Sequence, residues 1–362
     1  MGSSAGSDES AFSRVMEVAM LGVLPMALKA AMELKVMDIL AQHADEEGAG
    51  GVDGGSYLTA TQIAARVEGR TAPPEEAASA LDRILRVLAS HGLLASMSSS
   101  GSTSYGLTPS SRLLLQTGLN SLAPFVLLVQ DPVYWQAYYD FHQAVLQGGT
   151  IFARVHGMKS FAFTKKDPAF DQLFNRAMFA HSQLVMATLL DTYTGFQALH
   201  SLVDVGGSKG ACLGMITSRY PNIKGINFDL PHVIAGAPTY PGVEHIGGDM
   251  FVAIPKGEAI FMKWILHDWS DDHCWNIFKN CYSSLPNNGK VIVMDAILPK
   301  QVEQDADARA TYHMDLVMLA FNDGGKERTK EEFEALSMSV GFAKVQVLHN
   351  IHGLSVIEIS KV

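Results

Sequence analysis

His267 is the residue whose type and position first suggest chemistry in this sequence. It follows an apolar run, AIFMKWIL over residues 259–266, that predicts a buried strand. The polar stretch WSDDH then leads into a segment with helical apolar periodicity over 274–285. Open α/β sheets bind their ligands just beyond the carboxyl ends of their strands. A histidine at such an end is therefore a candidate general base.

Two other roles are open to His267. The stretch HDWSDDH gathers possible metal ligands, but it lacks the helical spacing of HExxH sites, so we predict no metal. A histidine in this position can also cap a helix or satisfy a polar group in the core.

A glycine-rich turn, VDVGGSKGA over 203–211, follows an earlier predicted strand. It is not a phosphate-binding P-loop, because no GK[ST] follows, and Gly206, Gly207 and Gly210 lack the GxGxxG spacing of dinucleotide-binding turns. Glycines here let a ligand approach the main chain closely. Asp204, just before them, can hold a cationic or hydroxylated group.

Two further aspartates, Asp229 in NFDLP and Asp249 in GGDMF, end the next two predicted strands. An acid at the end of the second strand of such folds binds ribose hydroxyls. Carboxylates at three strand ends suit a nucleoside with a positive centre better than a pyrophosphate.

The elements that must position these residues follow from the apolar patterning of the second half. Strands alternate with helical or turn segments, which predicts a parallel, doubly wound sheet. A helix over 308–321, a helix after Thr329 with the capping box TKEE, and two last strands over 344–350 and 354–360 follow. The five alternating strands are predicted over 201–205, 225–230, 243–247, 259–266 and 291–298.

The first third has a different pattern. Helical periodicity over 11–41 is broken once, at Pro25, and a glycine- and acid-rich linker follows over 44–57. Two helices, from Thr59 and over 73–92, precede a hairpin over 93–108. This is a winged-helix pattern, which often binds DNA, but its second helix is balanced in charge and its wing is serine-rich. Burial of the apolar first helices against a second chain is the favoured alternative, and an ordinary helical core is also open.

Length and composition set the class of protein. The chain has 362 residues, which favours two domains, and a net charge of -10, which argues against nucleic acid. It has no uncharged apolar run of 18 residues, so we predict no membrane span. The beginning, MGSSAGSDES, is unlike a signal or transit peptide. The cysteines Cys212, Cys274 and Cys281 have neither disulfide nor zinc spacing and favour a reducing cytosol.

Taken together, these motifs resemble the plant caffeic-acid and flavonoid type of S-adenosylmethionine-dependent O-methyltransferase. The resemblance rests on VDVGGSKG, GINFDLPHVI, GVEHIGGDMF, FMKWILHDWSDDHC, LPNNGKVIVMDAILP and NDGGKERTKEEF, and the helix VLPMALKAAMEL resembles the family's dimerisation domain. It implies a Rossmann-like methyltransferase sheet with acceptor-pocket helices over 121–362. It also implies a mainly helical, winged-helix-like dimerisation domain over 1–120, and hence a cytoplasmic homodimer.

The resemblance also assigns roles to residues. S-adenosylmethionine, which leaves as S-adenosylhomocysteine, is expected as the cofactor, without a metal. His267 is implied as the catalytic base, with Asp295 and Glu327 as acidic partners. The implied cofactor contacts are Gly206, Asp229, Asp249, Met250 and Lys263. The implied acceptor pocket contains Leu128, Val129, Phe174, Met178, His181, Met318, Phe321 and Asn322.

Several residues depart from the family's usual pattern. Ser208 stands where a third glycine is usual, and Asp295 stands where a glutamate is usual. Leu128, Val129 and Phe321 replace the usual Met, Asn and His. Because Val129 and Phe321 remove hydrogen-bonding groups, we expect an acceptor that is less polar or larger than caffeate.

We therefore predict methyl transfer to a hydroxyl of a small plant phenolic, such as a phenylpropanoid, flavonoid or stilbene. A phenolic amine, indole or alkaloid acceptor is an alternative for the same machinery. The changes at Ser208 and Asp295 also leave open a catalytically silent homologue that binds phenols.

Overall fold

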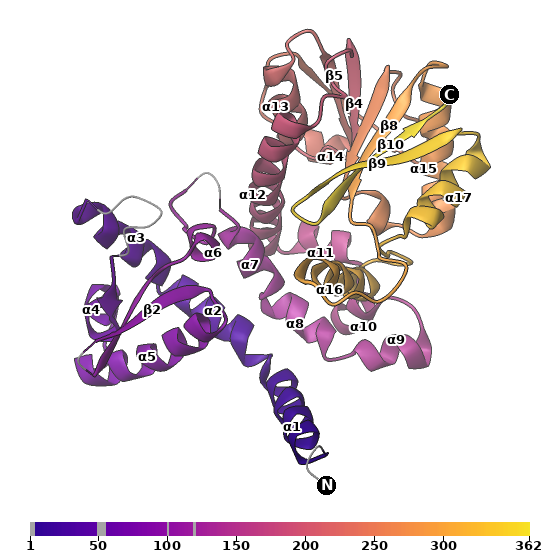
Figure 1. Cartoon of the computed structure of the whole chain (residues 1–362). Coiled ribbons are helices and arrows are strands. Elements are labelled where there is room, and N and C mark those ends of the chain that lie inside the picture. Colours follow the sequence, from indigo (N-terminus) through magenta and orange to yellow (C-terminus); the bar gives the residue numbers. More distant parts are fainter. Residues whose placement is uncertain (1–3, 49–55, 100, 119–120) are drawn as a thin grey trace. The chain divides into compact units, whose positions relative to one another are not determined.

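The structure is a computed structural model that describes residues 4–48, 56–99, 101–118 and 121–362. The chain forms two compact units (Figure 1). The first comprises Met1–Tyr134 with Gln172–His181, and the second comprises Trp135–Asp171 with Ser182–Val362. The predicted domain boundary at residue 120 and half of the predicted linker, residues 49–55 of 44–57, lie outside the described residues, so both stay predictions.

The first unit begins with three helices, α1 (Ser4–Met20), α2 (Val23–Glu33) and α3 (Val36–Glu46). The prediction of one break at Pro25 is wrong, because the chain breaks at Leu21–Gly22 and again at Leu34–Lys35. Pro25 lies in the first turn of α2, where the amide hydrogen that proline lacks would have no partner within the helix. At the second break Lys35 turns the chain with a φ of 54°.

The predicted helix, helix and hairpin are confirmed. Thr59 caps α4 through a capping box with Gln62, and α5 starts with Pro74 in its first turn. A three-stranded antiparallel sheet of order β1-β3-β2 lies beside them, and the short helices α6 and α7 follow. The bounds are β1 (Leu58–Thr59), α4 (Ala60–Arg66), α5 (Pro74–Ser90), β2 (Leu94–Ser99), β3 (Ser102–Leu107), α6 (Pro109–Arg112) and α7 (Ala123–Val129).

One apolar core holds this unit together. It gathers side chains from all of α2 to α5 and from the small sheet, so the first two of these helices are an integral part of it. Fully buried members are Ala31, Val36, Ile63, Leu85, Leu88 and Tyr105.

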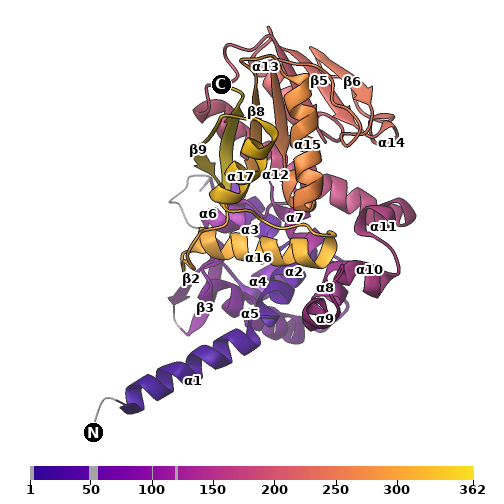
Figure 2. The same cartoon turned by 90° about the vertical axis from the view of Figure 1, so that its right-hand side faces the viewer.

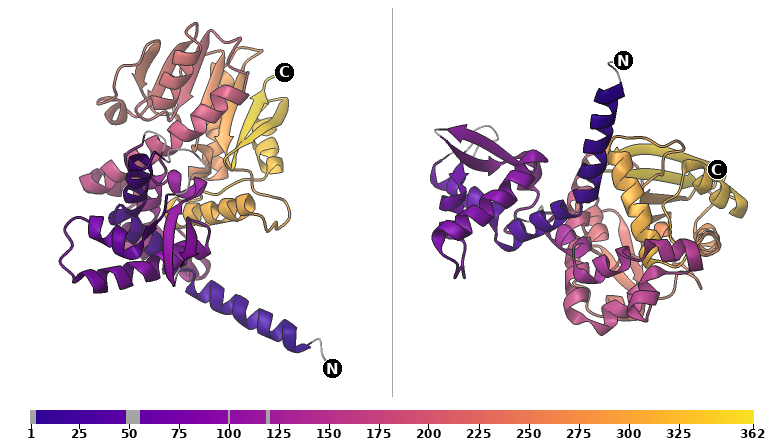
Figure 3. Two further views of the ribbon diagram at one scale, coloured as in Figure 1. Left: turned by 60° about the vertical axis from the view of Figure 1, so that its left-hand side comes forward. Right: turned by 90° about the horizontal axis from the view of Figure 1, so that it is seen from below.

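A seven-stranded sheet of order β6-β5-β4-β7-β8-β10-β9 forms the centre of the second unit (Figure 3). The strands β6, β5, β4, β7 and β8 are parallel, whereas β10 pairs antiparallel with both β8 and β9. The doubly wound, Rossmann-like fold is confirmed. The strands are β4 (Ser201–Val205), β5 (Lys224–Asp229), β6 (Val243–Gly247), β7 (Ala259–Lys263), β8 (Lys290–Asp295), β9 (Lys344–Ile351) and β10 (Leu354–Ser360).

Helices cover both faces of this sheet (Figure 2). Val291 and Val293 of β8 pack in the core on the side of α15 (Asp271–Ser284) and α17 (Lys330–Val340). Ile292 and Met294 pack in the opposite core, with α13 (Ala211–Arg219) and the last part of α12 (Pro168–Thr192). The strictly alternating burial follows from the period of two in a strand. The predicted capping box at Thr329 is confirmed as the start of α17.

The strand that leads to His267 is shorter than predicted. It ends at Lys263 rather than Leu266, because Trp264 adopts a left-handed φ of 55° and turns the chain out of the sheet. A single 3₁₀ turn, η1 (Leu266–Asp268), then carries His267. The apolar residues after Lys263 reflect burial, since Leu266 is fully buried, and not strand pairing.

Short helices precede α12 and another helix follows the sheet's fifth strand. Their aromatic side chains pack together, with Phe321 against Phe152 and Tyr138. Only the helix ending at Phe321 was predicted individually. These elements are α8 (Pro132–Tyr138), α9 (Phe141–Gln147), α10 (Ile151–His156), α11 (Ser160–Lys166) and α16 (Ala306–Phe321). A further short helix, α14 (Pro231–Ile234), follows β5.

Within the described residues, no single helix is both long and apolar enough to cross a membrane. Residues 9–20 and α2 meet the length and composition test only as a pair bent by 44°.

Candidate active site

His267 is buried at the carboxyl edge of the large sheet, and its ring is held by a carboxylate. Its Nδ1 donates to Oε1 of Glu327 over 2.7 Å. Its Nε2 lies 3.7 Å from Oδ1 of Asp268, and the Trp264 ring stacks nearly parallel to the imidazole at 6.0 Å. Because Nδ1 is engaged, Nε2 is the nitrogen that can exchange a proton with a ligand.

The surroundings of His267 favour its cation. Burial acts to lower the pKa of this histidine, but the charge of Glu327 and the hydrogen bond to it outweigh burial. Asp268 and Asp295 add to the effect, and the pKa of His267 rises to about 9. The imidazole is thus a stronger base than an ordinary histidine.

The two predicted acidic partners of His267 differ in their contacts. Glu327 is placed by its own amide, which donates to Oδ1 of Asp315 over 2.9 Å. Asp295 ends β8 fully buried, and neither of its oxygens finds a hydrogen-bond donor among the described residues. Burial, with Glu327 and Asp268 nearby, raises the pKa of Asp295 to about 7. The structure therefore pairs His267 with Glu327 by a hydrogen bond. Asp295 acts on His267 only through its charge, without a hydrogen bond among the described residues.

The glycine turn after β4 places Gly206 at the carboxyl end of that strand. Gly206 has a φ of 71°, a conformation that favours glycine, and a Cβ there would lie 2.4 Å from Cδ1 of Ile265. Asp229, at the end of β5, accepts the amides of Ser208 at 2.8 Å and Leu230 at 2.7 Å. These bonds fix the carboxylate, and each oxygen keeps a lone pair for a further donor.

Asp249 and Met250 follow the end of β6. Asp249 is exposed and accepts the amide of Phe251 at 2.9 Å. The carbonyl of Met250 accepts from Nδ2 of Asn280 at 2.7 Å, which ties this loop to α15. Gly206, Asp229, Asp249 and Met250 thus lie at the carboxyl ends of three neighbouring strands, as predicted.

Lys263 and Asp204 occupy the ends of the neighbouring strands β7 and β4. Burial lowers the pKa of Lys263 to about 8, and burial raises the pKa of Asp204 to about 7. Oδ2 of Asp204 is buried and has no hydrogen-bond donor in the described part of the chain. The sequence predicted that Asp204 can hold a cationic or hydroxylated group, but did not include it among the cofactor contacts implied by the resemblance.

The predicted acceptor residues of the first unit lie on two helices. Leu128 and Val129 are on α7, Leu128 fully buried and Val129 half-buried. Phe174, Met178 and His181 follow one another along one face of α12, because residues four and seven apart share a side. The His181 ring lies 5.6 Å from that of Phe125.

The predicted acceptor residues of the second unit lie at the end of α16, next to the His267 turn. Nδ2 of Asn322 donates to Oδ1 of Asp268 at 2.5 Å and lies 3.5 Å from Sδ of Met318. Asn322 and Met318 are therefore brought together with His267. Phe321 packs in the aromatic cluster with Phe152 and Tyr138.

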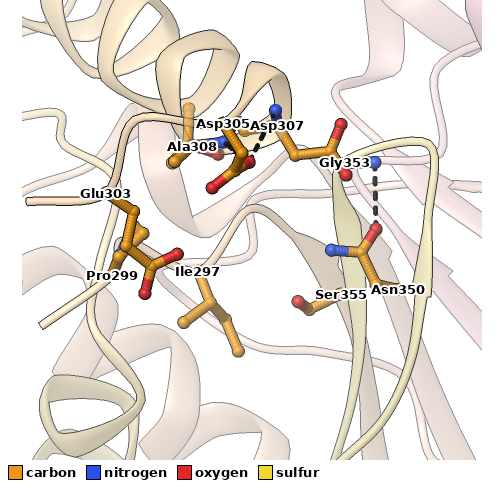
Figure 4. Close-up of a pocket in the computed structure, with 10 residues that line it drawn as sticks. Ile297, Pro299, Glu303, Asp305, Asp307, Ala308, Asn350, Gly353 and Ser355 are labelled. Carbon is orange, nitrogen blue, oxygen red and sulfur yellow. Dashed lines mark hydrogen bonds between the residues drawn. The ribbon is translucent and has the colours of Figure 1, made fainter.

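A polar cavity of about 240 Å³ lies elsewhere in the second unit (Figure 4). Asp305, Asp307 and Glu303 line it together with Asn350 and Ser355. Asp305 there caps α16 by accepting two amides, and Asn350 accepts the amide of Gly353. None of the predicted site residues lines this cavity, so the strand ends and not the cavity define the candidate site.

Two residues at the site were missed entirely. Asp268 bonds Asn322 and faces Nε2 of His267, and Arg328 binds the main chain on both sides of His267. Their adjacency in sequence to His267 and Glu327 was the only available signal. The described residues contain no group of three or more His, Cys, Asp or Glu that could hold a metal ion, and the absence of a metal stays a prediction.

Comparison with known proteins assigns the family. Residues 138–343 match the model of the O-methyltransferase domain, and residues 16–117 match that of the O-methyltransferase dimerisation domain. The chain is 47% identical over 348 residues to caffeic acid 3-O-methyltransferase of Clarkia breweri, covering 94% of this chain and 91% of the relative. It is also 47% identical to desmethyl-yatein O-methyltransferase of Sinopodophyllum hexandrum, covering 96% and 97%.

Solved structures agree in fold. The crystal structure of human N-acetylserotonin methyltransferase in complex with SAM superposes with a TM-score of 0.80 at 22% identity, covering 100% of this chain and 99% of that one. With two matching domains and near-full-length relatives, the chain belongs to the plant caffeic-acid type of S-adenosylmethionine-dependent O-methyltransferase and is an enzyme of that class.

Proposed function

We propose that this enzyme methylates a hydroxyl of a small plant phenolic, with His267 as the general base. The observation that carries the proposal is the buried pair of His267 and Glu327 at the carboxyl edge of the sheet. Relatives whose names give caffeic acid, desmethyl-yatein and esculetin as acceptors support the substrate class. The same names favour a phenol over an indole or alkaloid acceptor.

The strand ends fit S-adenosylmethionine. The bare main chain at Gly206 allows close approach, and the unpartnered oxygen of Asp204 offers an acceptor for an ammonium group. Asp229 and Asp249 offer carboxylates for ribose and adenine donors, with Met250 and Lys263 beside them. When bound, the cofactor supplies a methyl group on a positively charged sulfur.

The chain's own contribution to the chemistry is removal of the phenol proton. A phenol of pKa about 10 is only ~0.1% ionised at pH 7, a deficit of roughly 4 kcal/mol. Nε2 of a neutral His267 accepts that proton as the oxygen attacks. Glu327 holds the ring through Nδ1 and stabilises the imidazolium that forms, as the carboxylate of a hydrolase triad does.

Replacing His267 with glutamine tests this role. At pH 7 the rate of methyl transfer falls by about 10²–10⁴, the usual contribution of a positioned base. Cofactor Kd, measured by calorimetry, should stay unchanged, because Asp229 and Asp249 lie at the ends of other strands. Glu327→Gln should lower the rate of methyl transfer less than His267→Gln does. It removes the charge that stabilises the imidazolium and weakens the hold on the ring, but it leaves the base itself in place.

The pH profile provides the second readout. Because the pKa of His267 is raised to about 9, the free enzyme carries the cation at neutral pH, and only the neutral form accepts a proton. Wild-type kcat/KM therefore rises with pH and levels off near 9. The glutamine variant loses this limb and recovers only as the phenol itself ionises. Near-normal turnover of His267→Gln at pH 7 would place the base elsewhere.

We also propose an acceptor less polar than free caffeate, because Val129 and Phe321 offer no side-chain hydrogen bond. A mass-spectrometric screen of hydroxycinnamates, flavonoids, stilbenes and phenolic amines for the gain of one methyl group identifies it. Caffeate as the best substrate by kcat/KM contradicts this part of the proposal. No product with any of them would favour a silent phenol-binding homologue.

We propose that the enzyme works as a homodimer. The matched dimerisation domain supports this, and so does α1, whose Phe12, Val15 and Met20 are well exposed in the single chain. Exposed apolar side chains gathered on one helix are suited to burial against a second copy.

A further inference from the structure

Three consecutive residues hold the turn that carries His267. The amide of Lys326 donates to the carbonyl of His267 at 2.9 Å, and Glu327 accepts from Nδ1 of its ring. Arg328 binds the main chain around it through its side chain. One short segment thus contacts the carbonyl of His267, the imidazole ring of His267 and the main chain on both sides of this residue.

The contacts of Arg328 bracket His267. Nη1 donates to the carbonyl of Leu266 at 2.7 Å, and Nη2 donates to the carbonyl of Trp269 at 2.7 Å. Leu266 begins the 3₁₀ turn and Trp269 follows it, so the two carbonyls stand at its two ends. Nε and Nη2 also donate to Oδ1 of Asp271, at 3.0 and 2.8 Å. The guanidinium therefore spans the whole turn.

The segment that contains Arg328 is itself anchored. The carbonyl of Arg328 accepts the amide of Leu298 at 2.9 Å, and Ile297 and Arg328 form a parallel bridge just beyond β8. Gly325 fits so tightly that a Cβ there would lie 2.9 Å from the carbonyl of His267. The turn is consequently fixed to the sheet through residues 325–328.

We infer that Arg328 is a positioning residue for the reaction: by joining the carbonyls of Leu266 and Trp269 it holds the imidazole of His267 against Glu327 and sets where Nε2 points. This inference rests on the proposed role of His267 as the base.

The side chain is poorly suited to a purely structural task. Arg328 is about 1% exposed, whereas the one carboxylate that it pairs with among the described residues, Asp271, is 49% exposed. Burying a guanidinium against one half-exposed carboxylate offers little net stability, because the desolvation cost offsets the attraction. Its planar fork, by contrast, reaches two carbonyls and a carboxylate at fixed angles, which the single ammonium of lysine cannot do.

Arg328→Lys is the informative variant, because it keeps the positive charge and removes the fork. We expect kcat to fall by about 10- to 100-fold, since a displacement of about 1 Å in a reacting group costs about 10²-fold. The KM for the acceptor should change much less than kcat. The second readout is the dependence of kcat/KM on pH. The pH at which kcat/KM rises, called the acid limb, should shift in Arg328→Lys, whereas the loss of a purely structural residue would leave it in place.

The direction of that movement follows from the groups that face His267. Glu327 from the 326–328 segment, Asp268 from its own turn and Asp295 from the end of β8 all raise its pKa. Loosening the contact with Glu327 weakens the strongest of the interactions that raise this pKa. The pKa of His267 therefore falls, and the acid limb moves to lower pH. The charge of residue 328 is retained, so it does not account for the movement.

Lys290→Met is the matched control. Lys290 is a partly buried cation in the same unit, paired with Glu358 at 2.5 Å at the opposite end of β8. Its loss should lower Tm without moving the acid limb. The double variant Glu327→Gln/Arg328→Lys should show the limb of Glu327→Gln alone, because both changes act on one contact.

Wild-type kcat and an unmoved limb for Arg328→Lys overturn the inference. So does a lower Tm and lower activity with the limb in place, because that pattern is the one expected of Lys290→Met. His267→Gln measured alongside separates the two proposals: if it stays active, the base assignment fails, and if only Arg328→Lys stays active, the positioning role fails.

Discussion

Asp295 is a carboxylate that the fold buries without giving it a partner among the described residues. Glu327, equally buried, bonds His267. Asp295 stands where the resemblance to the family implies a glutamate, one methylene longer, and neither of its oxygens bonds the imidazole of His267. Its charge still favours the His267 cation.

Asp295→Asn should therefore stabilise the protein. The pKa of Asp295 is raised from 3.8 to about 7, so its charged form is penalised in the folded state. The penalty is absent below pH 4, grows between pH 4 and 7, and is complete above 7. We expect a gain of about 1–3 kcal/mol in the free energy of unfolding at pH 8 and almost none at pH 4, measured with urea. Methyl transfer should fall, because the charge beside His267 is lost.

Asp323→Asn is the control for this comparison, because Asp323 is exposed and only pairs with Lys159 at the surface. Its effect should stay within about 0.5 kcal/mol at both pH values. An Asp295→Asn variant that is less stable at pH 8 would mean that ordered water or another donor satisfies the carboxylate.

Motifs predicted residues that the fold brings to the candidate site, but not the contacts of these residues. His267 and Glu327 were both named from the sequence, and the structure pairs them. Asp295 was named as a partner on the same grounds, yet no described residue bonds it. Arg328 was missed because its role depends on carbonyls about 60 positions earlier in the chain, and no local pattern marks such a contact.

At the scale of elements, the two turns that end strands at the site both use left-handed residues other than glycine. Ser208 has a φ of 52° in the glycine turn after β4, and Trp264 has a φ of 55° after β7. The carbonyl of Ser208 accepts from Nδ2 of Asn227, and its amide donates to Asp229, which holds it there. Such backbone costs about 1–2 kcal/mol for a residue with a Cβ.

Ser208→Gly should relieve that strain. The gain is partly offset by the greater freedom of glycine in the unfolded chain, about 0.4–1 kcal/mol, so Tm should rise slightly or hold. Ser208→Val should lower Tm, because a β-branched side chain tolerates this conformation least. Thermal unfolding gives the Tm of the wild type and of both variants. A glycine variant with a lower Tm than the valine variant would contradict this prediction.

The positions of helices and strands were predicted well where an element buries one face. The predicted bounds were wrong where the chain turns. The start of a helix at Thr59 and the capping box at Thr329 were predicted, and helices start at both residues. The strand before His267 was extended too far, because WIL is apolar for reasons of burial. Pro25 was taken for a break, although a proline in the first turn of a helix is tolerated.

At the scale of the whole molecule, α1 and the helices after it have different roles. The apolar side chains of α1, such as Phe12 and Val15, are exposed, whereas Met32, Val36 and Leu40 of α2 and α3 are buried in the core of the first unit. Deleting residues 1–40 would therefore damage that core as well as any interface.

Deleting residues 1–21 isolates the interface. The shortened protein should keep a folded first unit, shown by its circular dichroism, but should become monomeric or aggregate in light scattering, with reduced activity. A Phe12→Ser/Val15→Ser variant, which keeps the helix length, should move in the same direction. A soluble, fully active monomer would show that α1 is dispensable for assembly.

The place of β10 between β8 and β9 affects how the enzyme can be made in a cell. A ribosome releases β8 long before β10, because 58 residues lie between Asp295 and Leu354. At about 5–20 residues per second, β8 waits roughly 3–12 s for its neighbour.

During that wait the apolar residues of β8 have an unpaired edge. Such an edge recruits strands of other chains. Nascent chains of this enzyme should therefore depend on chaperones late in synthesis. Slower codons placed between β8 and β10 should lower the yield of folded protein, whereas the same codons placed before β4 should not.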